Sequence, residues 1–245
     1  MAEYFHIDYE LSRERVLERI EERCQTAEGA GYIVVADGNV LVQVHRDLEY
    51  RSVVRDAFFS ICDSSWVPLY LRRIYGFQPQ QYSGSDIFRD ITGLKRYRMA
   101  FLGSSQQVLD ALRDNLAEID PSIADMLFME LPFAGVEDFD YENIAAHVNA
   151  YGPDIVWLAL GAPKQERFAA RLAPFLRRGV IIPVGAVFNF RAGLGIRRAP
   201  DWMVRMHLEF IYRIFSEPRK QLRRVWNILR YTPAILREER RKRDN

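Results

Sequence analysis

Short apolar runs rich in valine and isoleucine alternate with longer amphipathic stretches along most of the chain. Runs that are apolar at consecutive positions are typical of strands covered on both faces in a parallel sheet. They predict strands at Tyr32–Ala36, Phe58–Cys62, Met99–Gly103, Met126–Leu131, Ile155–Leu160 and Val180–Val184. The stretches between them have helical spacing and predict helices at Val40–Phe58, Ser65–Tyr75, Ser105–Ala117, Tyr141–Tyr151 and Gln165–Arg177.

Strands that alternate with helices favour right-handed crossovers, so we expect an α/β fold. The expected architecture is Rossmann-like and doubly wound, with a mainly parallel sheet and helices on both faces. The pattern changes near residue 196, where two basic amphipathic stretches, 202–215 and 219–231, are separated by Pro218. The charge run Glu238–Arg243 is expected to fray. We therefore expect a domain at 1–195 and a basic helical appendage at 196–245.

The net charge of +1 conceals an uneven distribution. Residues 196–245 hold 14 Lys and Arg against 6 Asp and Glu, while the rest of the chain holds 20 against 27. The basic end indicates an anionic partner, such as lipid head groups, diphosphates or nucleic acid. Arginine-rich amphipathic helices that contain tryptophan lie readily in an anionic membrane interface. Ordinary packing on the domain is the alternative, and no nucleic-acid-binding motif is present.

Other features limit the class of protein. The apolar run Gly179–Phe190 is shorter than the roughly 20 residues that a membrane-spanning helix needs, and it contains Pro183. Cys24 and Cys62 make no disulfide framework, which fits two core thiols in a reducing cytoplasm. The four histidines are scattered without ligand spacing, so no zinc site is expected.

Ligands of doubly wound sheets bind at the carboxyl ends of the strands. Glycine or small polar residues follow the predicted strands there, at Asp37–Asn39, Asp63–Ser65, Gly103–Ser105, Gly161–Glu166 and Gly185–Gly195. In the loop Gly161-Ala162-Pro163-Lys164-Gln165-Glu166, Lys164 and Gln165 begin the next predicted helix. Free N–H groups and the helix dipole favour an anion at such a position. A capped helix with Glu166 in its first turn is the alternative.

The string Gly161–Glu166 resembles the G-x-P-K-Q-E signature of the WecG/TagA/CpsF glycosyltransferases. Further blocks resemble that family in the same order, and they are Ser83–Asp86, Phe101–Ser104, Val184–Gly193, Arg198–Trp202 and Leu208–Arg219. The resemblance covers about residues 32 to 224. Among the departures from the family pattern are Ser64, where the family has a glycine after the aspartate, Asp37-Gly38 before Asn39, and two further positions. Asn189 stands where the family usually has aspartate, and Phe210 replaces a tryptophan.

The resemblance implies an inverting glycosyltransferase of the hexosyl or N-acetylhexosaminyl type. Such an enzyme moves a sugar from a UDP-sugar to a polyprenyl-diphosphate-linked sugar in the synthesis of exopolysaccharide, capsule or teichoic acid. No metal or other cofactor is expected. The implied location is the cytoplasm, peripheral on the inner face of the membrane. A membrane scaffold that binds nucleotide sugars without catalysis is the alternative. A nucleotide-binding oxidoreductase would need G-x-G-x-x-G after the first strand, where Asp37-Gly38-Asn39 stands instead.

Inversion requires a general base for the acceptor hydroxyl. By resemblance, Asp63 is the candidate catalytic base, although it could instead N-cap the following helix. Asn39 and Asp37 are the candidate acceptor-binding residues, and an Asx turn is the alternative role for Asn39. The candidate donor-binding residues are Gly103, Ser104, Gly161, Pro163, Lys164, Gln165, Glu166, Gly185, Asn189, Arg213, Arg219, Arg223 and Arg224.

Two of these interpretations have competing explanations. Glu209 and Arg213 lie four residues apart and could form a plain helical pair, and the C-terminal arginines could be a solvated basic face. The string Asp138-Phe139-Asp140 matches the D-x-D motif with which other glycosyltransferases hold a metal. It lies just before a predicted helix, where Asp140 suits an N-cap better.

Overall fold

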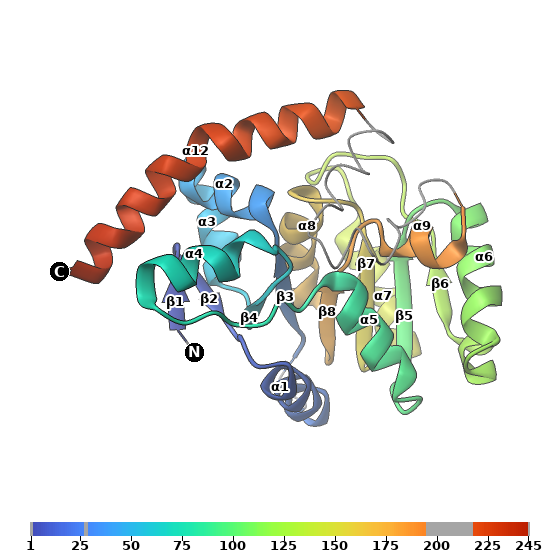
Figure 1. Ribbon diagram of the computed structural model, residues 1–245. Coiled ribbons are helices and arrows are strands. Elements are labelled where there is room, and N and C mark those ends of the chain that lie inside the picture. Colours follow the sequence, from blue (N-terminus) through green and yellow to red (C-terminus); the bar gives the residue numbers. More distant parts are fainter. Residues whose placement is uncertain (1, 27–28, 195–217, 245) are drawn as a thin grey trace.

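The computed structural model describes residues 2–26, 29–194 and 218–244 (Figure 1). Within them, one eight-stranded sheet has the order β1-β2-β4-β3-β8-β7-β5-β6. Only the β1–β2 pair is antiparallel, and the other pairs are parallel. The strands are β1 (Ala2–Tyr4), β2 (Ile7–Tyr9), β3 (Gly31–Ala36), β4 (Phe59–Cys62), β5 (Met99–Gly103), β6 (Leu127–Met129), β7 (Ile155–Ala159) and β8 (Val180–Pro183). All six predicted strands and the α/β class are confirmed, whereas the β1–β2 hairpin was not predicted.

Helices cover both faces of the sheet because side chains alternate along each strand. In β3, Val34 and Ala36 join one core cluster, while Ile33 and Val35 join the other. The first face is covered by α2 (Gly38–Arg46), α3 (Leu48–Arg55), α4 (Trp66–Tyr75), α7 (Tyr141–Tyr151) and α8 (Lys164–Leu172). The second face is covered by α1 (Arg13–Gln25), α5 (Gly84–Gly93), α6 (Gln106–Ala117) and α9 (Val187–Ala192), with a short 3-10 helix, η1 (Pro121–Asp125).

Two predicted helices are divided in the structure. The prediction of one helix at Val40–Phe58 is wrong, because Asp47 ends α2 and its carboxylate accepts the N–H of Tyr50 to begin α3. The predicted helix Gln165–Arg177 ends as α8 at Leu172 and continues as a 3-10 turn, η2 (Ala173–Phe175).

Three helices were not predicted, and two of them carry readable signals. In α1, Val16, Ile20 and Cys24 are buried at a spacing of four residues. Helix α5 begins with a capping box, in which Ser83 and Asp86 each accept the other's backbone N–H. The third, α9, is a six-residue helix, too short for a periodic pattern.

The C-terminal segment forms a single helix, α12 (Pro218–Asp244), which lies across α2 and α4 and ends near the N-terminal hairpin (Figure 1). The prediction that Glu238–Arg243 frays is wrong. The Glu239 side chain is only 2% exposed and accepts the N–H of Phe5 and the hydroxyl of Tyr75. None of the described helices is both long and apolar enough to cross a membrane. The predicted helix at 202–215 lies outside the described residues.

Candidate functional site

The predicted site loops follow adjacent strands at the carboxyl edge of the sheet. The loops after β4, β3, β8, β7 and β5 are neighbours in that order. From β5 the chain continues outward to β6, whereas from β7 it continues in the opposite direction to β8. Neighbouring parallel strands whose connections diverge in this way form a ligand crevice at their carboxyl ends. The strand order therefore predicts a ligand crevice between the Gly103 loop and the Gly161 loop.

Asp63, directly after β4, contacts the beginning of a different helix from the one that follows it. Its Oδ1 accepts the backbone N–H of Gly84, the first residue of α5, at 2.8 Å. The N-cap position of α4 belongs to Ser65, so the alternative that Asp63 caps the following helix is wrong. Free N–H groups at a helix start orient a carboxylate well. The start of α5, which is distant in sequence from the β4 loop, therefore fixes the orientation of the Asp63 carboxylate.

Asp37 and Arg224 join the β3 loop to the C-terminal helix. Oδ1 of Asp37 accepts the N–H groups of Asn39 and Val40, at 2.8 and 3.0 Å, which makes Asp37 the N-cap of α2. Oδ2 of Asp37 pairs with the Arg224 guanidinium. Burial lowers the pKa of Arg224 from its ordinary value. Arg224, predicted at the donor, therefore contacts the predicted acceptor loop, and Asp37 rather than Asn39 makes the Asx turn.

The Gly161 loop is organised around the side chain of Gln165. Its Oε1 accepts the N–H of Gly161 at 3.0 Å, and its Nε2 donates to Oε1 of Glu166 at 2.9 Å. A Cβ added to Gly185 would lie 3.2 Å from the same Oε1, so the β8 loop also packs against this amide. Glu166 is completely buried. The structure thus gives Glu166 a place beneath the loop instead of the predicted direct contact with the donor.

Lys164 and an exposed aromatic ring lie beside this loop. Nζ of Lys164 donates to the backbone carbonyl of Ala134 and lies 4.9 Å from the ring centre of Phe139 and 5.6 Å from that of Phe133. Phe133, in the loop after β6, is fully exposed. A large apolar ring that is held in solvent next to a cation suits a stacked, negatively charged ligand.

The β5 loop lies on the other side of this predicted crevice. Gly103 has φ of +97°, and a Cβ there would lie 2.7 Å from the carbonyl oxygen of Ala159, so β5 and β7 approach too closely for any other residue. Ser104 also has a left-handed backbone, with φ of +64°. Such conformations are uncommon outside glycine and concentrate at ligand sites.

Some predicted residues lie less centrally or outside the described part. Asn189 is half-buried on α9, and Arg223 is exposed on α12. Arg213 and Glu209 lie outside the described residues, as does the side chain of Arg219. In the D-x-D string, Asp140 accepts the N–H of Asn143 and caps α7, as predicted.

The candidate base and the donor loop both lie close to the segment that follows β8. A Cβ added to Gly84, whose N–H binds Asp63, would lie 3.9 Å from Cα of Val184. The next residue, Gly185, packs against Gln165. An oriented carboxylate and an anion-friendly loop therefore lie on two sides of one short β8 segment. This arrangement can hold an acceptor hydroxyl and a nucleotide donor next to each other.

Comparisons with known proteins identify the family of the chain. The model of the glycosyl transferase WecG/TagA/CpsF family matches residues 5–245. The chain belongs to this family. It is a glycosyltransferase.

Two curated relatives carry the name N-acetylglucosaminyldiphosphoundecaprenol N-acetyl-beta-D-mannosaminyltransferase. One, from Bacillus subtilis, is 27% identical over 204 residues, which cover 81% of this chain and 76% of the relative. The other, from Bacillus spizizenii, is 27% identical over 215 residues, which cover 85% and 80%.

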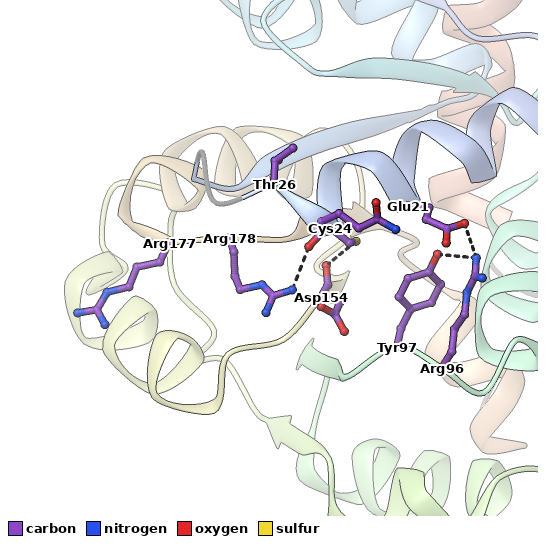
Figure 2. Close-up of a pocket in the computed structure, with 9 residues that line it drawn as sticks. Glu21, Cys24, Thr26, Arg96, Tyr97, Asp154, Arg177 and Arg178 are labelled. Atoms are coloured by element: carbon purple, nitrogen blue, oxygen red, sulfur yellow. Dashed lines mark hydrogen bonds and ion pairs between the residues drawn. The ribbon is translucent and has the colours of Figure 1, made fainter.

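The opposite, amino edge of the sheet of this glycosyltransferase holds a cavity of about 630 Å³ (Figure 2). Its charged groups are largely paired with each other. Arg178 binds Asp154, and Arg96 binds Glu21 and the Tyr97 hydroxyl. Arg177 points away from these pairs in Figure 2. Most of the charged groups in the lining of this cavity are therefore engaged in ion pairs with each other.

Sequence reasoning missed three residues at the carboxyl edge. The backbone N–H of Gly84 binds Asp63. The capping box at Ser83 is the sequence signal that could have predicted the start of a helix at this position. Phe133 could have been noticed as an apolar residue in a loop after a predicted strand. Tyr50, whose buried hydroxyl faces Glu166, carries no local signal because the contact joins α3 to α8.

Proposed function

We propose that this glycosyltransferase moves a sugar from a UDP-sugar to a sugar linked to polyprenyl diphosphate, with inversion at the anomeric carbon. The observation that carries the proposal is the run of contacts from Asp63 through Gly84 and Val184–Gly185 to Gln165. These contacts bring a carboxylate close to the loop that we propose binds the donor diphosphate. The names of the two relatives, which include a diphosphoundecaprenol-linked N-acetylglucosamine, support the class of acceptor.

In the proposed reaction, Asp63 is the general base. It takes the proton of the acceptor hydroxyl as that oxygen attacks C1 of the donor sugar. A bond forms between the acceptor oxygen and C1, and the bond from C1 to the phosphate oxygen breaks on the opposite side. UDP leaves with the electron pair of that bond. The N–H of Gly84 fixes one carboxylate oxygen, so the direction of proton transfer is set before the acceptor arrives.

We place the donor in the crevice between the β5 and β7 loops. The backbone of Gly103, Ser104 and Gly161, with the start of α8, would cradle the diphosphate. Lys164 supplies positive charge and Phe133 an exposed surface for the base. The remaining proposed donor contacts are Pro163, Gln165, Gly185, Asn189, Arg213, Arg219 and Arg223, with Glu166 acting only indirectly.

We place the acceptor at the start of α2, beside Asn39 and Asp37. Arg224 lies there on Asp37, so its charge faces the acceptor loop rather than the donor crevice. A diphosphate that binds at this position would share the guanidinium with Asp37. The β3 loop and the N-terminal half of α12 together form the proposed acceptor side.

The proposed peripheral position on the cytoplasmic face of the membrane depends on α12. Leu222, Trp226 and Leu229 recur at helical spacing and are 55%, 66% and 64% exposed. Apolar residues on one exposed helix face, flanked by arginines such as Arg223 and Arg230, are typical of a helix in an anionic membrane interface. We retain residues 196–245 as the membrane-facing appendage and residues 1–195 as the catalytic domain.

The reaction is tested with the full chain, a panel of UDP-hexoses and UDP-N-acetylhexosamines, and a polyprenyl-diphosphate N-acetylglucosamine acceptor. We expect transfer of one sugar, UDP release in equal amount, and a product whose anomeric configuration is opposite to that of the donor by NMR. Retained configuration would contradict inversion. UDP binding without transfer over the whole panel would contradict the donor and acceptor assignments.

The membrane contact is tested by flotation with vesicles that contain anionic lipid. Replacement of Leu222, Trp226 and Leu229 by serine should reduce binding at least tenfold, since each loses apolar area from the interface. Leu48→Ser is the matched control, because Leu48 is 72% exposed on α3. Equal flotation of the triple variant and the control would overturn the role of α12.

A further inference from the structure

A completely buried carboxyl lies directly beneath the Gly161 loop. Oε1 of Glu166 accepts from Nε2 of Gln165 at 2.9 Å, whereas Oε2 has no hydrogen-bond partner among the residues that the structure describes. An unpaired buried polar atom in a folded protein requires an explanation, because its desolvation destabilises the fold. The atom lies one residue from the glutamine that organises the loop.

The surroundings of Glu166 favour its neutral form. The hydroxyl of Tyr50 faces the carboxyl, near enough to influence its pKa but outside hydrogen-bond geometry. The adjacent cation, Arg167, is directed away, because its guanidinium pairs with Asp47 and Glu49 at 2.7 and 2.6 Å. Burial raises the pKa of Glu166, against the opposing effect of the Gln165 hydrogen bond. Burial also raises the pKa of Tyr50, so burial acts against the charged form of both groups.

A neutral carboxylic acid has a particular use at this position. Its carbonyl oxygen accepts from the Gln165 amide, and the proton on its other oxygen avoids a buried charge at Oε2. The amide of Gln165 could otherwise rotate by half a turn, exchanging its oxygen for its NH2 group. That rotation would place a donor against the N–H of Gly161, which now donates to Oε1 at 3.0 Å.

We propose that Glu166 is a positioning residue which, as a neutral acid, holds the Gln165 amide with its oxygen toward Gly161 and Gly185. The orientation of this amide then sets the shape of two loops at once, because Gly185 packs on the same oxygen. The consequence for catalysis rests on the proposed function, in which these loops bind the UDP-sugar. Glu166 itself touches no substrate and acts through Gln165.

The first test compares Glu166→Gln with Glu166→Ala. A glutamine keeps both an acceptor for Gln165 and a donor in place of the acid O–H, so we expect rescue to within about threefold of the wild-type KM for the UDP-sugar. Alanine leaves Nε2 of Gln165 without its partner and should raise that KM about tenfold. If E166Q were as impaired as E166A, the charge would be required and the proposal would fail.

A double-mutant cycle separates positioning from general destabilisation. If Glu166 acts through Gln165, E166A should change the KM less than about twofold in a Gln165→Ala background. Independent effects would instead multiply, which would overturn the proposal. Leu172→Ala, a buried position two turns further along the same helix, is the control that lowers stability without removing a neighbour of Gln165.

NMR of the Gln165 side-chain amide tests the contact without any ligand. We expect its resonances to move in E166A and to stay near the wild-type positions in E166Q; unmoved resonances in E166A would overturn the proposal. Failure of the wild-type protein to bind UDP would contradict the proposed function. The amide resonances of Gln165 would still show whether Glu166 positions this side chain.

Discussion

Two aspartates at opposite edges of the same sheet make similar local contacts but have different surroundings. Asp63, after β4, accepts the N–H of Gly84 at 2.8 Å, and Asp154, before β7, accepts the N–H of Arg98 at 2.9 Å. Asp154 also pairs with Arg178 inside the cavity of Figure 2. Asp63 lies next to the β8 segment that contacts the donor loop. A backbone hydrogen bond therefore does not separate a structural carboxylate from a candidate base, whereas the sheet edge does.

Glycines at the two edges repeat this comparison. Gly103 and Gly179 have φ of +97° and +95°, and a Cβ on either would lie under 3 Å from a backbone oxygen, at 2.7 and 2.8 Å. Both allow close packing of strand ends. Only Gly103 borders the proposed donor crevice. We therefore expect substitutions at the two glycines to cause similar strain but to affect donor binding only at Gly103.

The largest effect is expected for Asp63→Asn. Loss of the general base should lower kcat by between about 100-fold and 10,000-fold, because an amide cannot take the acceptor proton. Asp154→Asn is the matched control and should keep kcat within about twofold. Initial rates of UDP release measure both. Full activity in D63N would show that Asp63 is not the general base. An equal loss of kcat in D154N would show that the two edges of the sheet do not differ in function.

The second effect comes from the paired glycines. Gly103→Ala and Gly179→Ala should each destabilise the protein by about 1–3 kcal/mol, since a left-handed backbone and a close backbone contact oppose a Cβ. Urea unfolding measures this change. Only G103A should also raise the KM for the UDP-sugar. An equal rise in G179A would mean that the KM reports stability rather than the crevice.

A smaller effect is expected for Phe133→Ala. Loss of a stacked base should weaken UDP binding about tenfold, measured by calorimetry, with little change in the melting temperature because the ring is fully exposed. Phe175→Ala, which removes another exposed ring from η2, should leave the affinity unchanged. Unaltered UDP affinity in F133A would exclude the ring from the donor site.

The smallest effect is expected in how steeply the free energy of unfolding changes with pH. The folded pKa of Glu166 is raised, so between the ordinary glutamate pKa of about 4.3 and the raised value the folded protein holds a proton that the unfolded chain has lost. This contribution to stability therefore falls as pH rises through that window. Glu166→Gln should flatten the decline in urea unfolding over a pH series. An identical slope in both proteins would show that Glu166 ionises normally.

The fold was largely readable because the dominant signal is local. Consecutive apolar positions such as Ile155–Ala159 and helical spacing such as that of Tyr141–Tyr151 identify elements without knowledge of their neighbours. The clearest failure has a non-local cause. The run Glu238–Arg243 looks solvated, yet Glu239 is buried because distant groups, the N–H of Phe5 and the hydroxyl of Tyr75, satisfy its carboxylate.

The sequence by itself determined the α/β class, the order of the strands along the chain and the loops that follow them, because periodicity and glycine positions act over short distances. It also carried the family resemblance that the family comparison confirmed. Only the tertiary structure decided which loops become neighbours. Spatial strand order brings Gly84 to Asp63 and Arg224 to Asp37, and it buries Glu166 beneath Gln165. Those contacts depend on how the strands pair, and no local pattern in the chain encodes that pairing.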